Sequence, residues 1–129
     1  MDAQLAREMY KEHILELFKH PHNEGKLQTP THKNKGYNPL CGDEVTIEIQ
    51  EKDGKVEDIK FQGKGCAISI ASTSLLTDHI KGKPLQEIKA MKAEELLDLL
   101  QIPISSVRMK CALLCLETTH KALNKENEN

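Results

Sequence analysis

The middle of the chain carries a single β-hairpin pattern, and this pattern most constrains the fold. Residues 44–50 alternate polar and apolar side chains, as in a strand with one face in water. Asp53-Gly54 predicts a tight turn, after which Lys55–Gln62 forms the return strand. Val56 and Ile59 are both apolar but three positions apart, which breaks the alternation and predicts a bulge or a register change.

Helical patterns flank this hairpin on both sides. The first ends before the turn-rich segment Pro21–Leu40, which predicts a connecting loop with room for a short edge strand. Because the pattern has no βαβ alternation, it favours an α+β domain in which a small antiparallel sheet has helices packed on one face. The expected helices are Leu5–Lys19, Ala67–Ile80, Met91–Leu100 and a last helix that Ser105 or Ser106 caps and that runs to Leu123, before a frayed end at Lys125–Asn129.

Length and charge exclude several classes of protein. With 129 residues, the chain is long enough for one globular domain, which we expect to span residues 1–129. Its 18 Lys and Arg against 20 Asp and Glu leave a net charge of −2, without the basic excess that nucleic-acid binding requires. No apolar run is long enough to cross a membrane or to serve as an export signal, which predicts a cytoplasmic protein with no membrane partner.

The four cysteines are the residues with the most chemical potential. In a reducing compartment, metal binding or sulfur chemistry explains them better than disulfides do. Cys41 and Asp43 are two positions apart, so in an extended chain their side chains point to the same side and can converge on one ion. Cys66 lies between a strand and a helix, where the positive end of the helix dipole favours a thiolate. Cys111 lies in the first turns of the last helix.

Three cysteines and one carboxylate make four candidate ligands for a tetrahedral Zn²⁺ ion or for an iron–sulfur cluster. No C-x-x-C pair is present, so the spacing leaves a second interpretation open, in which the cysteines are unrelated small core residues. Cys115 follows Cys111 by one helical turn and could be a further ligand. Because leucines surround Cys115, we expect it to be buried and passive.

Three segments resemble the cysteine motifs of a known family. Asn38–Asp43, Phe61–Ser72 and Arg108–Ala112 are similar, in the same order, to motifs of the iron–sulfur cluster assembly scaffold family, which comprises IscU, SufU and the N-terminal domain of NifU. Residues 10–25 also resemble the opening segment of that family, so the likeness covers nearly the whole chain. The resemblance implies an IscU/SufU-like fold.

The resemblance also implies roles for individual residues. Cys41, Cys66 and Cys111 match the sulfur-accepting and cluster- or zinc-ligating cysteines of the family, and Asp43 matches the carboxylate beside the first of them. Among these, Cys41 and Cys111 are the candidate persulfide acceptors. Arg108 is expected to support the site, because a nearby cation offsets the negative charge of a thiolate-rich centre.

The implied function is a scaffold that takes persulfide sulfur from a PLP-dependent cysteine desulfurase. It then assembles a transient [2Fe–2S] cluster or relays the sulfur, and iron–sulfur acceptor proteins receive the product. Zn²⁺ is the alternative resting metal. We expect a scaffold without catalysis of its own, with zinc-dependent sulfurtransferase activity as the alternative. A different hypothesis is a small structural zinc-binding interaction module, which Asp43 argues against because such sites are usually closed by Cys and His.

The subfamily stays open at this stage. Lys110 stands where the IscU branch has a histidine that can act as a ligand, so Arg108-x-Lys110-Cys111 follows the SufU pattern. Protonated lysine cannot replace histidine as a ligand. SufU proteins, however, carry an insertion between the second and third cysteines, whereas Cys111 follows Cys66 here by only 45 positions. The chain therefore resembles SufU in its motifs and IscU in its length.

Overall fold

The computed structural model describes residues 3–124, with side chains from residue 11 onward. It confirms the α+β class, because a three-stranded antiparallel sheet precedes a run of helices. The end that was expected to fray, Lys125–Asn129, lies outside the described residues. The elements in chain order are α1 (Ala3–Lys19), β1 (His32–Asn38), β2 (Asp43–Lys52), β3 (Lys55–Lys64), α2 (Ala67–Ile80), α3 (Leu85–Lys89), α4 (Ala93–Leu100) and α5 (Met109–Asn124).

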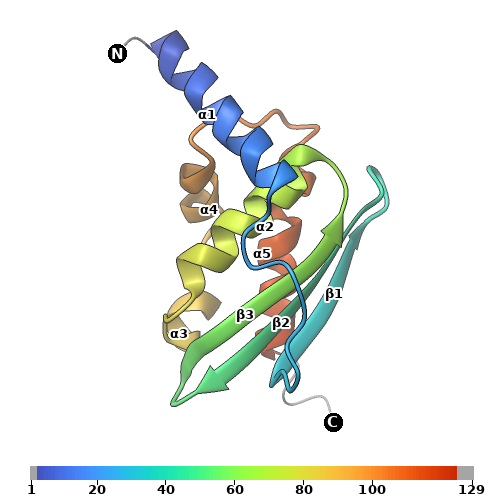
Figure 1. The fold of residues 1–129 in the computed structure, drawn as a ribbon, viewed down its shortest axis with the longest axis vertical. Coiled ribbons are helices and arrows are strands. Elements are labelled where there is room, and N and C mark those ends of the chain that lie inside the picture. Colours follow the sequence, from blue (N-terminus) through green and yellow to red (C-terminus); the bar gives the residue numbers. More distant parts are fainter. Residues whose placement is uncertain (1–2, 125–129) are drawn as a thin grey trace.

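The sheet has the order β1-β2-β3, and α5 and α2 lie on one face of it (Figure 1). The predicted hairpin is confirmed, since Asp53 and Gly54 both have positive φ angles and join β2 to β3. The predicted irregularity is also confirmed, because the pairing register shifts after Gln50. Val56 and Ile59 consequently both face the core although they are three positions apart.

The core lies between the sheet and the helices and is almost entirely aliphatic. The inward side chains of β2, such as Ile47 and Ile49, pack there against leucines and isoleucines of the helices. Phe61 of β3 is the only buried aromatic side chain in residues 11–124, and its exposed fraction is 0%. With aromatics at 3% of the chain, this one ring is the largest apolar side chain that the described core contains.

The turn-rich segment contains more structure than a connecting loop. Its second half forms β1, a full edge strand that pairs with β2 from His32 to Asn38. Its first half crosses the face of the sheet opposite the helices, where the Leu27 N–H donates a hydrogen bond of 2.9 Å to Oε1 of Glu48. Glu48 is 3% exposed, so the face expected to lie in water is covered at this point.

The helix after the sheet was placed correctly and the later ones were placed in part. α2 has the predicted bounds. The expected helix Met91–Leu100 is too long, because α4 begins at Ala93, and the short helix α3 was not expected. Pro84 follows the end of α2 and is the N-cap of α3. Ser105 accepts the N–H of Arg108 and so caps a turn that leads into α5.

Candidate metal centre

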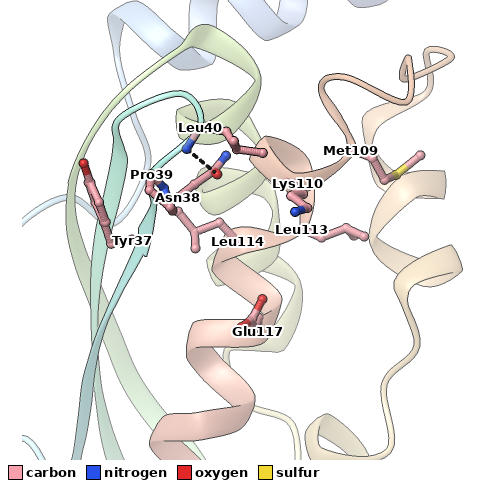
Figure 2. A pocket seen from close by; sticks show the side chains of 9 residues that line it. All are labelled: Tyr37, Asn38, Pro39, Leu40, Met109, Lys110, Leu113, Leu114 and Glu117. Carbon is pink, nitrogen blue, oxygen red and sulfur yellow. Dashed lines mark hydrogen bonds between the residues drawn. The ribbon is translucent and has the colours of Figure 1, made fainter.

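The loop after β1 and the start of α5 lie side by side at one end of the sheet (Figure 2). Between them is an open cleft of about 340 Å³. Leu40 and Lys110 line this cleft and are the chain neighbours of Cys41 and Cys111, which do not line it themselves. The complete lining is Tyr37, Asn38, Pro39, Leu40, Met109, Lys110, Leu113, Leu114 and Glu117.

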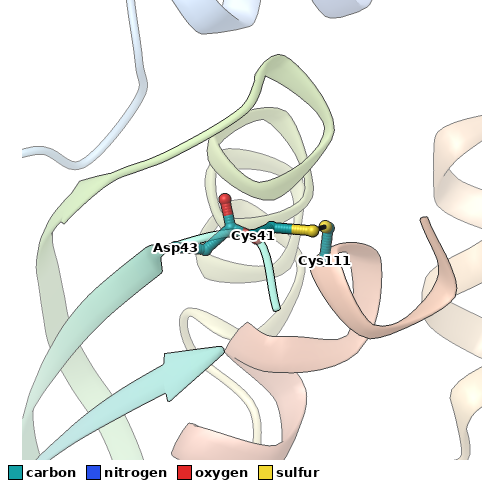
Figure 3. A group of neighbouring side chains, drawn as sticks. All are labelled: Cys41, Asp43 and Cys111. Carbon is teal, nitrogen blue, oxygen red and sulfur yellow. Dashed lines mark hydrogen bonds between the residues drawn. The ribbon is translucent and has the colours of Figure 1, made fainter. Parts of the chain in front are cut away.

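Three of the four predicted ligands come together at this place. One ligand atom each of Cys41, Asp43 and Cys111 lies within 4.8 Å of the other two. The Cys111 thiol donates a hydrogen bond to Sγ of Cys41 over 3.3 Å, and the two sulfur atoms face each other (Figure 3). Asp43 and Cys111 are buried, at 0% and 1% exposure, whereas Cys41 is exposed. The group is therefore closed on the protein side and open at Cys41.

Cys41 and Asp43 meet for a reason other than the one expected from the sequence. The spacing argument assumed an extended chain, but residues 39–42 form the loop between Asn38 and Asp43, which are paired partners in the β1-β2 ladder. Gly42 has a φ of 74°, a left-handed conformation that glycine adopts without strain. Its N–H donates to the Asn38 carbonyl over 2.8 Å, which closes the turn.

Asn38 organises this group and was missed as a site residue. Its side-chain nitrogen Nδ2 is 3.4 Å from Oδ2 of Asp43 and 3.7 Å from Sγ of Cys111, and it donates to both. Its Oδ1 accepts the N–H of Leu40 over 3.3 Å, as Figure 2 also shows. In the sequence, Asn38 is recognisable only as part of an Asn-Pro turn. Its role could have been predicted from the β1-β2 register, which places Asn38 opposite Asp43, the first residue of β2.

Cys66 lies beside the group of three but its thiol is not part of it. It is the N-cap of α2, as expected, and its backbone N–H donates to Oδ1 of Asp43 over 3.0 Å. Asp43 thus ties the start of β2 to the start of α2, where a carboxylate is favoured by the helix dipole. Cys66 is partly exposed, so its side chain is accessible at the same end of the sheet.

The surroundings of Cys111 favour the protonated thiol over the thiolate. Burial raises the pKa of the Cys111 thiol, and its hydrogen bonds to Asp43 and Cys41 raise it further. The negative charges of Cys66 and Asp43 act in the same direction. The metal-free site therefore keeps a proton on Cys111, and a bound cation would have to displace that proton.

The remaining candidates lie outside the group. Cys115 is 1% exposed and belongs to the core, and burial raises its pKa to about 12. Its expected burial is confirmed. The side chains of Arg108 and Lys110 are exposed at the start of α5. A supporting role of Arg108 at the site stays a prediction.

Gly65 gives a test of the link between Asp43 and α2. It has a φ of 149°, and a Cβ atom at this position would collide with Oδ1 of Asp43. We expect Gly65→Ala to displace the carboxylate and to weaken zinc binding by about 10-fold or more, the usual cost of disturbing a ligand's support. Competition titration with a chromogenic chelator measures this affinity.

Gly82→Ala is the matched control for backbone strain. Gly82 also has a positive φ, of 87°, but a Cβ atom there would meet nothing within 4 Å. Both variants should lose stability because of their left-handed backbone. Only Gly65→Ala should lose zinc affinity, and equal affinities in the two variants would contradict the role given to Gly65.

A family model for the NifU-like N-terminal domain matches residues 9–128. The chain belongs to this family. It is 34% identical to the iron–sulfur cluster assembly scaffold protein IscU of Haemophilus influenzae, with 88% of this chain and 92% of the relative covered. It is 34% identical to IscU 1 of Archaeoglobus fulgidus, an iron–sulfur cluster assembly scaffold protein, with 89% and 74% covered.

Solved structures agree with the family. FiSufU of the SUF system, from Fervidobacterium islandicum AW-1, superposes with a TM-score of 0.78 at 31% identity, covering 92% of this chain and 98% of the other. The N-terminal domain of a NifU-like protein from Brucella abortus superposes at 0.76 and 22% identity, covering 95% and 96%, which shows a shared fold. The IscU/SufU-like fold that the sequence motifs implied is therefore confirmed.

Proposed function

We propose that this chain is a scaffold of iron–sulfur cluster assembly that accepts sulfur from a cysteine desulfurase. One observation carries the proposal: two thiols and a buried carboxylate converge within 4.8 Å, in a chain of the NifU-like N-terminal family. The relatives named IscU are iron–sulfur cluster assembly scaffold proteins, and that function is carried over here to this chain. Cys66 is the fourth candidate ligand.

The donor set fits a metal that is held and then released. Thiolates are the ligands that zinc and iron–sulfur clusters take in proteins, and Cys41, Cys66 and Cys111 would supply three of them. Asp43 would supply an oxygen, the weakest donor of the four and the easiest to exchange. A resident Zn²⁺ would keep the thiolates deprotonated, which the metal-free environment of Cys111 does not do. Exposed Arg108 would offset the negative charge of such a site.

Sulfur is proposed to enter at Cys41. Its thiolate attacks the outer sulfur of the desulfurase persulfide, the sulfur–sulfur bond breaks, and the desulfurase cysteine leaves as a thiolate. This reaction requires that the attacking sulfur be reached from outside the protein. Cys41 is exposed and Cys111 is 1% exposed, so of the two candidate acceptors Cys41 is the one accessible to a partner.

The surroundings of Cys41 favour a protein partner. Leu40 is 75% exposed and Val107 is 76% exposed, and these apolar side chains belong to the two segments that carry the cysteines. Tyr37, at the end of β1, is 57% exposed. Tyr37 and Leu40 line the same cleft, and exposed apolar side chains that gather in one place are typical of interaction surfaces. We assign them to the docking of the desulfurase or of an acceptor protein. No helix in residues 3–124 is long and apolar enough to cross a bilayer.

Zinc analysis combined with alkylation tests this proposal. Aerobic expression should give about one zinc per chain, because zinc outlasts a labile cluster in a thiolate site. The metal-bound protein should react slowly with iodoacetamide at all four cysteines. Chelation should expose Cys41 and Cys66, whereas the buried Cys111 and Cys115 should stay protected in the folded protein.

Two results would contradict the proposed site. A preparation with neither zinc nor a cluster, and with no zinc affinity on titration, would remove the metal centre. Alkylation of Cys115 after mild chelation, without loss of the folded state, would add it to the site and overturn its assignment to the core. Unfolding with urea before alkylation is the control that shows all four cysteines to be reactive once exposed.

A further inference from the structure

The two sulfur atoms of the group are close enough to react with each other. Sγ of Cys41 and Sγ of Cys111 are 3.3 Å apart and joined by a hydrogen bond. They come from different elements, the loop after β1 and the first turn of α5 (Figure 3). One is exposed and the other buried, an arrangement that suits an accepting thiol with a second thiol behind it.

Sulfur that arrives as a persulfide must gain two electrons before it can serve as sulfide in a cluster. Two thiols that join as a disulfide release two electrons, so a neighbouring thiol pair supplies the number required. We propose that Cys111 resolves a persulfide on Cys41, which releases hydrogen sulfide and leaves a Cys41–Cys111 disulfide. This inference rests on the proposed function, because it begins with sulfur on Cys41.

The step balances in atoms and electrons. Sγ of Cys111 attacks Sγ of Cys41, the bond from Cys41 to the terminal sulfur breaks, and that sulfur leaves with both bonding electrons. The thiol proton of Cys111 passes first to the carboxylate of Asp43, which lies within 4.8 Å, and from there to the departing sulfur. The products are one disulfide and one hydrogen sulfide. A dithiol reductant would restore the two thiols for another round.

The other two cysteines are placed differently, and Cys115 serves as the control. The thiol of Cys66 lies outside the group that Cys41 and Cys111 share. Cys115 is 1% exposed, and its thiol is 3.8 Å from the Ala112 carbonyl oxygen within α5. Neither is joined to Cys41 by a hydrogen bond of the kind that Cys111 makes. The geometry therefore selects Cys111 as the resolving thiol.

The test loads the full chain with sulfur chemically and measures what leaves. Chelated protein is treated anaerobically with inorganic polysulfide, desalted and assayed for free sulfide, and its disulfides are mapped by mass spectrometry. The wild type should release about one sulfide per chain without added reductant and should form the Cys41–Cys111 disulfide. Cys111→Ser should keep its persulfide on Cys41 and release sulfide at least about tenfold more slowly, whereas Cys115→Ala should behave as the wild type does.

Two results would overturn the inference. These are sulfide release from Cys111→Ser at the wild-type rate, and a disulfide that joins Cys41 to Cys66. A second measurement avoids the variants altogether: limited oxidation of the wild type with diamide should link Cys41 to Cys111 before any other pair, and a different first pair would contradict the geometry. Because polysulfide replaces the desulfurase, a failure to resolve the persulfide is distinguishable from a failure to receive sulfur from that enzyme.

Discussion

Replacing Asp43 by Cys is expected to slow zinc release and to reduce sulfur acceptance from a cysteine desulfurase. The change converts a site of three thiolates and one carboxylate into a site of four thiolates, the closed type found in structural zinc proteins. Zinc release to a chelator should become slower by about tenfold or more. Desulfurase turnover with the variant as acceptor should fall, because the most exchangeable ligand is gone and Cys41 is released from the ion less often.

The same substitution has a separate cost in the metal-free protein. Asp43 is 0% exposed, and its carboxylate accepts hydrogen bonds from the Cys66 N–H and from the side chain of Asn38. Loss of hydrogen bonds to a buried charged group should lower the free energy of unfolding of the chelated protein by about 1–3 kcal/mol. Urea denaturation with and without zinc separates this loss from the gain in metal affinity.

This experiment also decides between the two functional hypotheses. A structural zinc module would hold zinc more tightly in Asp43→Cys and would have no desulfurase-linked activity to lose. Asp43→Asn is a suitable companion variant, because it keeps the shape and one hydrogen-bonding oxygen but removes the charge. Equal turnover with wild-type and Asp43→Cys proteins, together with slower zinc release, would refute the exchange role of Asp43.

Replacing Phe61 by Ala should cost about 3–5 kcal/mol in the free energy of unfolding, a large share of the roughly 5–15 kcal/mol typical of a domain. Phe61 is 0% exposed and is the only aromatic ring buried among residues 11–124. The substitution leaves a cavity where the ring was, and the surrounding aliphatic core has no other aromatic ring that could fill it. Chemical denaturation followed by circular dichroism gives the measurement.

Two variants control for the position and the size of this change. Phe61→Leu keeps most of the volume and should cost less than about 1.5 kcal/mol. Phe18→Ala removes a ring that is 42% exposed and should cost well under half of the Phe61→Ala loss. If Phe61→Ala destabilises the protein no more than Phe18→Ala does, the ring is not a major part of the core.

Local patterns predicted the parts of the fold that depend on neighbours in sequence. The hairpin turn at Asp53-Gly54 and the irregular register near Val56 both follow from a few adjacent residues. The bounds of α2 were also predicted, because glycines precede the helix and Gly82 and Pro84 follow it. Such elements are specified by turn chemistry and side-chain periodicity.

Long-range contacts explain what the sequence patterns missed. The turn-rich segment was expected to hold at most a short edge strand, whereas β1 runs from His32 to Asn38 because it pairs with β2 along its whole length. Glu48 was expected in water because its position alternates with apolar residues, yet it is buried by the segment that contains Leu27. Patterns of neighbouring residues cannot predict these two contacts. One joins separate strands, and the other joins Leu27 to Glu48, about twenty positions apart.

The candidate site also contains some residues that the sequence predicted and others that it did not. Residue chemistry and the family motifs pointed to Cys41, Asp43 and Cys111, and these three come together. The positions of Asn38 and Gly65 around the carboxylate could not be predicted, because they arise from the hairpin register and from the approach of α2. Cys66 was expected as a fourth ligand, and the structure places its backbone at Asp43 and its thiol outside the group.

The most direct test of the central claim maps sulfur on the chain after reaction with a cysteine desulfurase. The full chain carrying Cys111→Ser, which cannot resolve a persulfide on Cys41, is incubated anaerobically with the enzyme and cysteine, quenched by alkylation and analysed by peptide mass spectrometry. The account predicts an added sulfur atom on Cys41, and none on the buried Cys115. Sulfur on no cysteine of this variant, or only on a cysteine other than Cys41, would contradict it.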